Sequence, residues 1–404
     1  MYIVLYFIIR FIGNIWAIFM EYSKKIYLDY NSTTPVDPRA LDEMLPYFTD
    51  RYGNPSSSSH TFGWEAEEAV EIAREQVAGL IGATANEIYF TSGATEAVNL
   101  AIRGLCKANR DKGNHVITCI TEHKAVLDTC ESLEQMGYRV TYLPVDASGS
   151  IDLKEVEDSI TDQTILVCLM QANNEIGTIH PLEKICRITG SKNIPFMSDA
   201  TQAVGKIPVD VKELGVDVIT FSSHKLYGPK GIGALYISKN DKPDIFPILT
   251  GGGQERGLRP GTLNVPAIVG FGKACEICRK EMESDSNRLG QLRNKLESEL
   301  ADIDGVMVNG ASDNRLPYMT SVSFQNIDGS NLIRRLRNLA VSQGSACTSA
   351  THKPSHVLKA IGHSDELARS TIRLGLGRFT TEQEIEYAIR DIKEVIPRLK
   401  LLAQ

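Results

Sequence analysis

Short β-rich runs that alternate with helical segments constrain the fold of this chain more than any other feature of its sequence. The runs are rich in branched and aromatic residues, and apolar residues recur at helical spacing in the segments around them, as in residues 64–80. Strands that alternate with helices form a mostly parallel sheet that is covered on both faces. We therefore predict an α/β fold with a seven-stranded sheet, its strands at residues 87–91, 115–120, 139–143, 165–170, 194–198, 216–222 and 233–237.

The pattern changes after about residue 265 and predicts a smaller α+β domain. Helices are expected over 268–284, 287–301 and 330–339, and strands over 306–309 and 321–324. A terminal helix begins at Thr381, which together with Glu384 matches a capping box. The expected units are an apolar extension (1–19), an N-terminal part of the small domain (20–34), a large domain (35–265) and the rest of the small domain (266–404).

Composition excludes some classes of function. Of the 404 residues, 42% are apolar, which allows a sizeable core. The net charge of −7 argues against a direct, high-affinity surface for nucleic acid. Eight cysteines over this length are not a disulfide framework and indicate a reducing, cytoplasmic compartment. Cys275 and Cys278 form a C-x-x-C pair, but no second pair with ligand spacing follows, so a zinc site is not expected there.

Residues 1–19 differ from the rest of the chain because they are nearly all apolar, with Arg10 as their one charge. The run is marginal in length for a membrane span, and a central arginine is costly there. A signal peptide fits poorly, since no basic stretch precedes the apolar run and no small-residue cleavage site follows it. We expect translation to start at Met20, with a membrane anchor or a packing helix as the alternatives.

The most informative motif is Ser-Ser-His-Lys, which follows the predicted strand 216–222 and precedes a glycine-rich turn. Its lysine, Lys225, is expected at the end of a buried strand. A lysine in a partly dry site loses its charge more easily and becomes an amine nucleophile. Such an amine is what a covalent link to an aldehyde cofactor requires. A surface lysine in a turn is the common alternative for this motif taken alone.

Three further motifs also follow predicted strands. Asp199 is placed where its carboxylate can pair with a pyridinium nitrogen. Ser92-Gly93-Ala94-Thr95 opens a helix, where backbone N–H groups and hydroxyls bind phosphate. His123 follows another strand and is placed to stack on a ring. Ligands bind at the carboxyl ends of strands in open α/β sheets, so together these motifs indicate a site for pyridoxal phosphate (PLP).

The sequence resembles the group I (NifS/IscS-type) cysteine desulfurases from about residue 25 to about residue 400. This resemblance implies the PLP-dependent transferase fold type I of class V aminotransferases, with residues 35–265 as the PLP-binding domain. It also implies the conversion of L-cysteine to L-alanine. The stretches that carry it are YLDYNSTTPVDPR (27–39), GNPSSSSH (53–60), FTSGATEAVNLAI (90–102), TEHKAVLDTC (121–130), NNEIG (173–177), DATQ (199–202), SSHKLYGPKGIGALY (222–236), GGGQERGLRPGT (251–262) and SQGSACTSA (342–350).

The resemblance assigns roles to individual residues. Lys225 corresponds to the Schiff-base lysine, Asp199 to the partner of the pyridine nitrogen, and His123 to the stacking residue and a proton carrier. Arg373 corresponds to the arginine that clamps the substrate carboxylate, a task that suits a bidentate guanidinium. Other residues implied at the cofactor are Asn174, also at the substrate, and Gln202 near the ring or its phenolic oxygen, with Ala94, Thr95, Ser222 and His224 at the phosphate.

Cys347 is expected to be the catalytic thiol. It lies among small polar residues in the segment 342–354, which predicts a mobile loop in which a thiolate is accessible. The resemblance implies that Cys347 attacks the substrate sulfur, becomes a persulfide and carries the sulfur to an acceptor protein. It also implies that Cys347 serves as a transient iron–sulfur ligand shared with a scaffold protein.

The resemblance further implies partners. Thr262 corresponds to a threonine that reaches the phosphate of the other subunit, which implies a homodimer with composite sites. The acceptor is left open among an iron–sulfur scaffold, a relay for tRNA thiolation and a thiamine pathway. Relatives of the iron–sulfur type often carry a further C-terminal tail, so docking through such a tail is not expected here.

Some alternatives stay open at this point. A group II desulfurase or selenocysteine lyase has a different motif around its cysteine, and another PLP enzyme of the same fold would not need Cys347. A non-catalytic assembly subunit is disfavoured because Lys225, Asp199, His123 and Arg373 are all present. Ser223 departs from the Gly or Ala that relatives often have before the His-Lys pair, and we expect only a small effect on the phosphate pocket.

Overall fold

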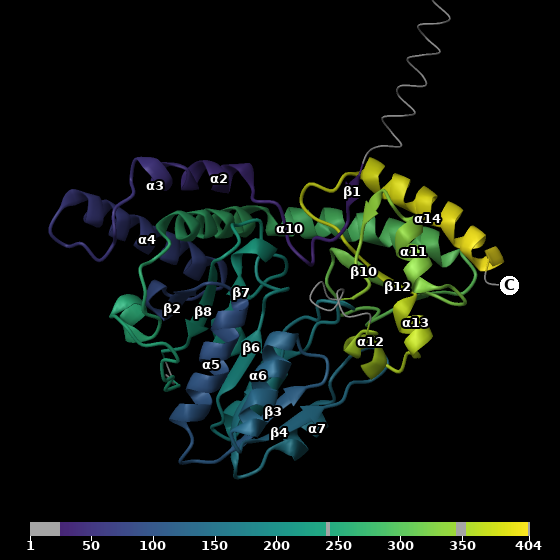
Figure 1. The fold of residues 1–404 in the computed structure, drawn as a ribbon. Coiled ribbons are helices and arrows are strands. Elements are labelled where there is room, and N and C mark those ends of the chain that lie inside the picture. Colours follow the sequence, from purple (N-terminus) through teal and green to yellow (C-terminus); the bar gives the residue numbers. More distant parts are fainter. Residues whose placement is uncertain (1–24, 240–242, 345–352, 403–404) are drawn as a thin grey trace, which may run out of the picture.

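A computed structural model describes residues 25–239, 243–344 and 353–402 of the chain (Figure 1). The predictions for residues 1–19 and for Cys347 lie outside these ranges. Among the described residues, no helix is both long and apolar enough to cross a membrane.

The central sheet has seven strands in the order β2-β8-β7-β6-β5-β3-β4. Only β8 runs antiparallel to its neighbours, so the predicted mostly parallel seven-stranded sheet is confirmed. The carboxyl ends of the other strands therefore lie at one edge, together with the start of β8. The strands are β2 (Ile88–Thr91), β3 (His115–Cys119), β4 (Arg139–Leu143), β5 (Thr164–Cys168), β6 (Phe196–Asp199), β7 (Val218–Ser222) and β8 (Gly233–Ile237).

Helices cover both faces of this sheet because successive strand residues point to opposite sides. In β3, Val116 packs with helices α5 (Ala94–Ala108) and α6 (Lys124–Gln135), whereas Ile117 belongs to the core on the other face. That other face is covered by α4 (Thr61–Leu80), α8 (Leu182–Ser191) and α10 (Val265–Ala301). Strands buried on both faces explain the nearly continuous apolar runs in the sequence.

A second group of strands lies at the other end of α10 (Figure 1). Strand β10 (Met319–Phe324) pairs antiparallel with β9 (Val306–Val308) and with β12 (Thr371–Gly375). Strand β1 (Ile26–Tyr27) pairs in parallel with β11 (Leu339–Ala340), so the start of the described chain joins its C-terminal part. Strands β1, β11 and β12 were not predicted from the sequence.

Two helix predictions in this region are wrong. One continuous helix, α10, replaces the two predicted over 268–284 and 287–301. The residues at the expected break, Asp285 and Ser286, resemble a helix start, but Asp285 pairs with Arg378 and Ser286 donates to the main-chain oxygen of Lys206. Helix α11 (Gly329–Arg335) is shorter than the predicted helix 330–339, because the chain turns at residues 336–338 and enters β11 at Leu339.

The remaining helices are short or terminal. The capping box of α14 (Glu382–Leu402) is confirmed, since Thr381 N–H donates to Glu384 and Glu384 N–H donates back to the Thr381 hydroxyl. The predicted boundary between the large and the small domain near residue 265 stays a prediction. The other helices are α2 (Pro38–Met44), α3 (Pro46–Thr49), α7 (Leu153–Ser159), α9 (Val211–Leu214), α12 (His356–Ala360) and α13 (Asp365–Arg369), and the 3-10 turns are η1 (Ala85–Glu87), η2 (Ser223–Lys225) and η3 (Gln254–Gly257).

Candidate active site

A cavity of about 540 Å³ lies at the carboxyl edge of the central sheet. Its volume is in the range of sites for small ligands. Its walls come from the ends of β2, β6 and β7, from the starts of α5 and α6, from residues 31–33 and from Arg373 on β12. Most of the predicted site residues line this cavity: Ala94, Thr95, His123, Asn174, Asp199, Gln202, Ser222, His224, Lys225 and Arg373.

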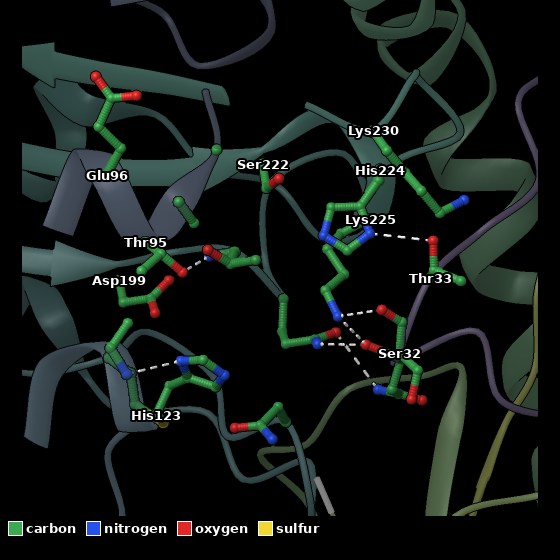
Figure 2. Close-up of a pocket in the computed structure, with 18 of the residues that line it drawn as sticks. Ser32, Thr33, Thr95, Glu96, His123, Asp199, Ser222, His224, Lys225 and Lys230 are labelled. Atoms are coloured by element: carbon green, nitrogen blue, oxygen red, sulfur yellow. Dashed lines mark hydrogen bonds between the residues drawn. The ribbon is translucent and has the colours of Figure 1, made fainter. Parts of the chain in front are cut away.

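Lys225 ends the 3-10 turn that follows β7, and its side chain extends into the cavity (Figure 2). Its Nζ donates to the main-chain oxygens of Asn31 and Ser32, at 2.5 and 2.6 Å. The segment around Asn31, Ser32 and Thr33 therefore forms one wall of the site. Sequence analysis gave these three residues no role, although the stretch YLDYNSTTPVDPR was among the motifs of the family.

One end of the cavity is rich in hydrogen-bond donors. The first turn of α5 presents Ala94 and Thr95, and Ser222 ends the neighbouring strand. Backbone N–H groups at a helix start, together with hydroxyls, favour an anion such as phosphate. Burial, with the charges of Lys225 and Lys230 nearby, lowers the pKa of His224 to about 4. His224 is therefore neutral near pH 7, and its Nδ1 lies 3.1 Å from the Thr33 hydroxyl.

Glu96 also lines the cavity beside this helix start. Its carboxylate accepts from the Ser92 N–H at 2.7 Å and from Arg259 Nε at 2.7 Å. Although burial opposes ionisation, the bonds from Arg259 and Ser92 hold the pKa of Glu96 below its usual value. The pair connects the helix start to the stretch GGGQERGLRPGT.

Asp199 and His123 line the same cavity, and Figure 2 shows Asp199 between Thr95 and His123 in that view. Asp199 is the last residue of β6, and its Oδ1 accepts from the Thr201 N–H at 2.9 Å. His123 is the N-cap of α6, and its Nδ1 accepts from the Ala125 N–H at 3.1 Å. Because Nδ1 accepts, a neutral His123 ring carries its proton on Nε2.

Arg373 is almost fully buried at 2% exposure. Its guanidinium donates to the main-chain oxygen of Asn174, to Asp29 and to the Ser32 hydroxyl, at 2.8, 2.8 and 2.7 Å. These bonds orient the arginine at the cavity wall. Within the described residues, Arg373 Nε, Asn31 Oδ1 and Thr201 Oγ1 are buried without a hydrogen-bond partner, so the cavity offers polar atoms to a ligand.

Two of the predicted residues are not brought into this cavity. Thr262 is exposed and does not line it, so its predicted contact with another subunit's phosphate stays a prediction. Cys347 lies outside the described residues, so its predicted catalytic and metal-binding roles stay predictions. In the part of the chain that is described, no cluster of three or more His, Cys, Asp or Glu side chains is placed to hold a metal ion.

The donor set fits a small phosphorylated aldehyde with a ring nitrogen. The start of α5 can bind a phosphate, Lys225 supplies an amine, and Asp199 supplies a carboxylate. The unpartnered Arg373 Nε and Thr201 Oγ1 are further polar groups that such a ligand could satisfy.

Comparison with known proteins agrees with this arrangement. The family model of class V aminotransferases matches residues 26–388. The chain is 52% identical over 379 residues to the cysteine desulfurase IscS of Rickettsia bellii, which covers 94% of this chain and 92% of that protein. The IscS of Rickettsia typhi is also 52% identical over the same length. The chain belongs to the cysteine desulfurase family.

Solved structures agree with membership of the cysteine desulfurase family. A NifS-like protein superposes with a TM-score of 0.87 at 41% identity, covering 93% of this chain and 100% of that one. A structure described as SspA in complex with cysteine gives a TM-score of 0.79 at 39% identity, covering 89% and 100%. The expected fold type and the expected family are therefore both confirmed.

Proposed function

We propose that this chain is a PLP-dependent cysteine desulfurase that converts L-cysteine to L-alanine and passes the sulfur through Cys347 to an acceptor protein. The observation that carries the proposal is the meeting of Lys225, Asp199 and His123 with the start of α5 in one cavity. The relatives named IscS and the structure of SspA with cysteine support the choice of substrate.

In this proposal the cavity residues hold PLP. The start of α5, Ser222 and His224 would bind its phosphate, Asp199 would pair with its ring nitrogen and His123 would stack on its ring. When bound, PLP supplies an aldehyde that combines with amines and a ring that withdraws electrons from the adjacent carbon. Asp199 maintains the charge of the ring nitrogen, which strengthens that withdrawal.

The side chains of this protein bind and deprotonate the substrate. Arg373 binds the cysteine carboxylate, with Nε as the N–H group that has no partner among the described residues, and this fixes the amino acid in the cavity. Lys225 accepts the α-proton at Nζ, and His123 Nε2 is a second position from which a proton can be donated. Asn174 contributes to substrate binding in two ways. Its main-chain oxygen orients Arg373, and the residue itself lines the cavity.

Sulfur leaves the substrate through Cys347. The Cys347 thiolate forms a bond to the substrate sulfur while the bond between that sulfur and the β-carbon breaks. The electron pair of the broken bond remains with the carbon skeleton, which takes up a proton and leaves as alanine. Cys347 is then a persulfide, and we propose that it delivers its outer sulfur to an iron–sulfur scaffold or a tRNA-thiolation relay. Transient iron–sulfur ligation by Cys347 belongs to the same proposal.

The proposal includes a cytoplasmic homodimer in which Thr262 contributes to the phosphate site of the partner. The exposure of Thr262 and its position outside its own cavity support this arrangement. The free cysteines among the described residues agree with a reducing compartment.

A paired assay on wild type and Cys347→Ala tests the proposal. Both proteins are expected to show the visible absorption of bound PLP, and only wild type is expected to release alanine and sulfide from L-cysteine with a thiol present. The loss in the variant should be at least about a hundredfold, since the nucleophile itself is removed.

Cys186→Ala is the matched control, because Cys186 is buried on α8 and does not line the cavity. It should retain the activity of wild type. A Cys347→Ala protein that keeps both PLP and activity would contradict the persulfide step and favour another PLP reaction on this fold.

A further inference from the structure

Lys206 is a buried lysine behind the cavity, and nothing in the proposed chemistry uses it. The residue is 7% exposed. Its Nζ lies 3.5 Å from Gln202 Oε1 and 4.1 Å from the centre of the Tyr318 ring. Within the described part of the chain it forms no ion pair. Asp285, which lines the same small cavity as Lys206, pairs with Arg378 at 2.8 Å.

A buried lysine without a carboxylate partner is costly for the folded state. Desolvation disfavours the ammonium, and an apolar residue of similar size would be cheaper in the same position. The cation–π contact with Tyr318 offsets only part of this cost. The contribution of Lys206 to stability therefore does not account for its presence.

The hydrogen bonds of Gln202 indicate what Lys206 does. Gln202 Nε2 donates to the main-chain oxygen of Asn31 at 3.0 Å. That oxygen can only accept, so the amide nitrogen must face it, and Gln202 Oε1 must face the other way. The Tyr318 hydroxyl and Lys206 Nζ lie on that side.

Tyr318 alone does not fully satisfy Gln202 Oε1. Its hydroxyl has one proton and lies 2.7 Å from the main-chain oxygen of Gln202 and 3.0 Å from Oε1. Asn31 Nδ2 lies at a distance similar to that of Lys206, 3.4 Å from Oε1, and also contacts Met319 Sδ at 3.0 Å. The Lys206 amine has N–H donors whether or not it is protonated, so it can donate to Oε1 whichever oxygen the tyrosine chooses. With Lys206 as the ammonium, the reversed amide would place two donors against each other.

We propose that Lys206 is a positioning residue that holds the Gln202 amide with its NH₂ group toward the cavity. One N–H of that group bonds to Asn31, and the other is available to an anionic oxygen of the ligand. Under the proposed function, on which this inference rests, that oxygen is the phenolic oxygen of PLP. The same Asn31 oxygen accepts from Lys225, so the amide and the reactive amine are fixed by one acceptor.

The experiment follows the visible absorption of the PLP-loaded protein across a pH titration in wild type and Lys206→Met. Loss of a donor to Gln202 and loss of a nearby positive group both make the phenolate less favourable. The pH midpoint of the spectral change is therefore expected to rise by about one unit. Other titratable or charged groups near Lys206 stay the same in both proteins: Tyr227, Lys225, Cys278, Asp285, Tyr318, Arg373 and Arg378.

Thermal unfolding of the cofactor-free proteins separates positioning from a structural role. The Lys206→Met protein should unfold at the same temperature as wild type or higher, because an uncompensated buried amine is removed. Lys184→Met is the matched control, since Lys184 is exposed on α8 and should change neither measurement. Lys206→Gln serves as a second variant if the methionine protein does not fold.

A double-mutant cycle with Gln202→Ala tests whether Lys206 acts through Gln202. In the Gln202→Ala background, Lys206→Met should shift the midpoint by much less than in wild type. An equal shift in both backgrounds, or no shift in either, would overturn the inference while PLP binding stands. A wild-type protein without the absorption of bound PLP would instead overturn the proposed function, and the inference with it.

Discussion

The buried histidine His180 shows how the environment of a side chain sets its charge in this protein. His180 is 3% exposed, and within the described residues neither of its ring nitrogens has a hydrogen-bond partner. Burial lowers its pKa to about 4, against an opposing effect of Asp146. The ring is therefore mostly neutral in the folded protein above about pH 4.

Replacement of His180 by methionine should reduce the acid sensitivity of the fold. Above pH 6.5 the histidine is neutral in both the folded and the unfolded state. Between pH 6.5 and about 4 only the unfolded state takes the proton, so the wild-type free energy of unfolding falls in that window. The contribution of His180 to that fall is about 3 kcal/mol.

Denaturant unfolding of both cofactor-free proteins at pH 7 and pH 4.5 provides the measurement. Between the two pH values the free energy of unfolding should fall less in His180→Met than in wild type. The expected difference is about 2 kcal/mol, which follows from the pKa difference of His180 between the folded and unfolded states. Equal losses in the two proteins would show that the histidine has a partner in solution.

At the scale of elements, a close approach between β8 and the start of α5 shapes the phosphate end of the cavity. A Cβ on Gly233, the first residue of β8, would lie 2.7 Å from Gly93 Cα and 2.7 Å from the main-chain oxygen of Phe221. Both contacts are backbone atoms, so they cannot be relieved by a side-chain rotation. Glycine at this position lets β8 and the start of α5 approach each other closely.

Gly233→Ala should therefore weaken PLP binding and destabilise the fold. Overpacking against backbone costs about 1–3 kcal/mol, and displacement of the Gly93 turn should reduce PLP affinity by roughly tenfold. PLP fluorescence titration and thermal unfolding measure the two effects. Gly190→Ala is the control, because nothing lies within 4 Å of a Cβ there and helix α8 should gain slightly. Unchanged PLP affinity in Gly233→Ala would show that the turn does not bind the phosphate.

At the scale of the whole molecule, the cavity is assembled from three distant parts of the chain. Asn31 and Ser32 come from the N-terminal part, Lys225 from the central sheet, and Arg373 from β12. Arg373 bonds to Asp29 as well as to Asn174, which ties the parts together. The proposed subunit contact through Thr262 would add a fourth part from another chain.

Thr262→Ala tests that contact. If Thr262 reaches the partner's phosphate, the variant should bind PLP about tenfold more weakly, which is the effect of one lost hydrogen bond to a charged group. Fluorescence titration gives the affinity, and sedimentation gives the oligomeric state. Thr161→Ala, an exposed threonine beyond the cavity, is the control. A dimeric variant with wild-type affinity would contradict a composite site.

The sequence alone predicted the elements whose signals are local. Six of the seven central strands are short runs buried on both faces, so their apolar residues mark them without knowledge of their neighbours, whereas the edge strand β4 is partly exposed. The polar residues that follow these runs, such as Asp199 and Lys225, could be placed at one edge because parallel strands share their carboxyl ends. Family motifs then supplied Arg373 and Gln202.

The tertiary structure decided what depends on contacts between distant segments. Strands β1 and β11 have two residues each and form only because they pair with each other. Helix α10 runs through Asp285, whose carboxylate pairs with Arg378 from a distant segment of the chain. Lys206 gains its proposed role from Gln202 and Tyr318, and the latter is more than a hundred residues away in sequence. No pattern within one segment encodes such partners, because the free energy of each contact exists only once the chain has folded.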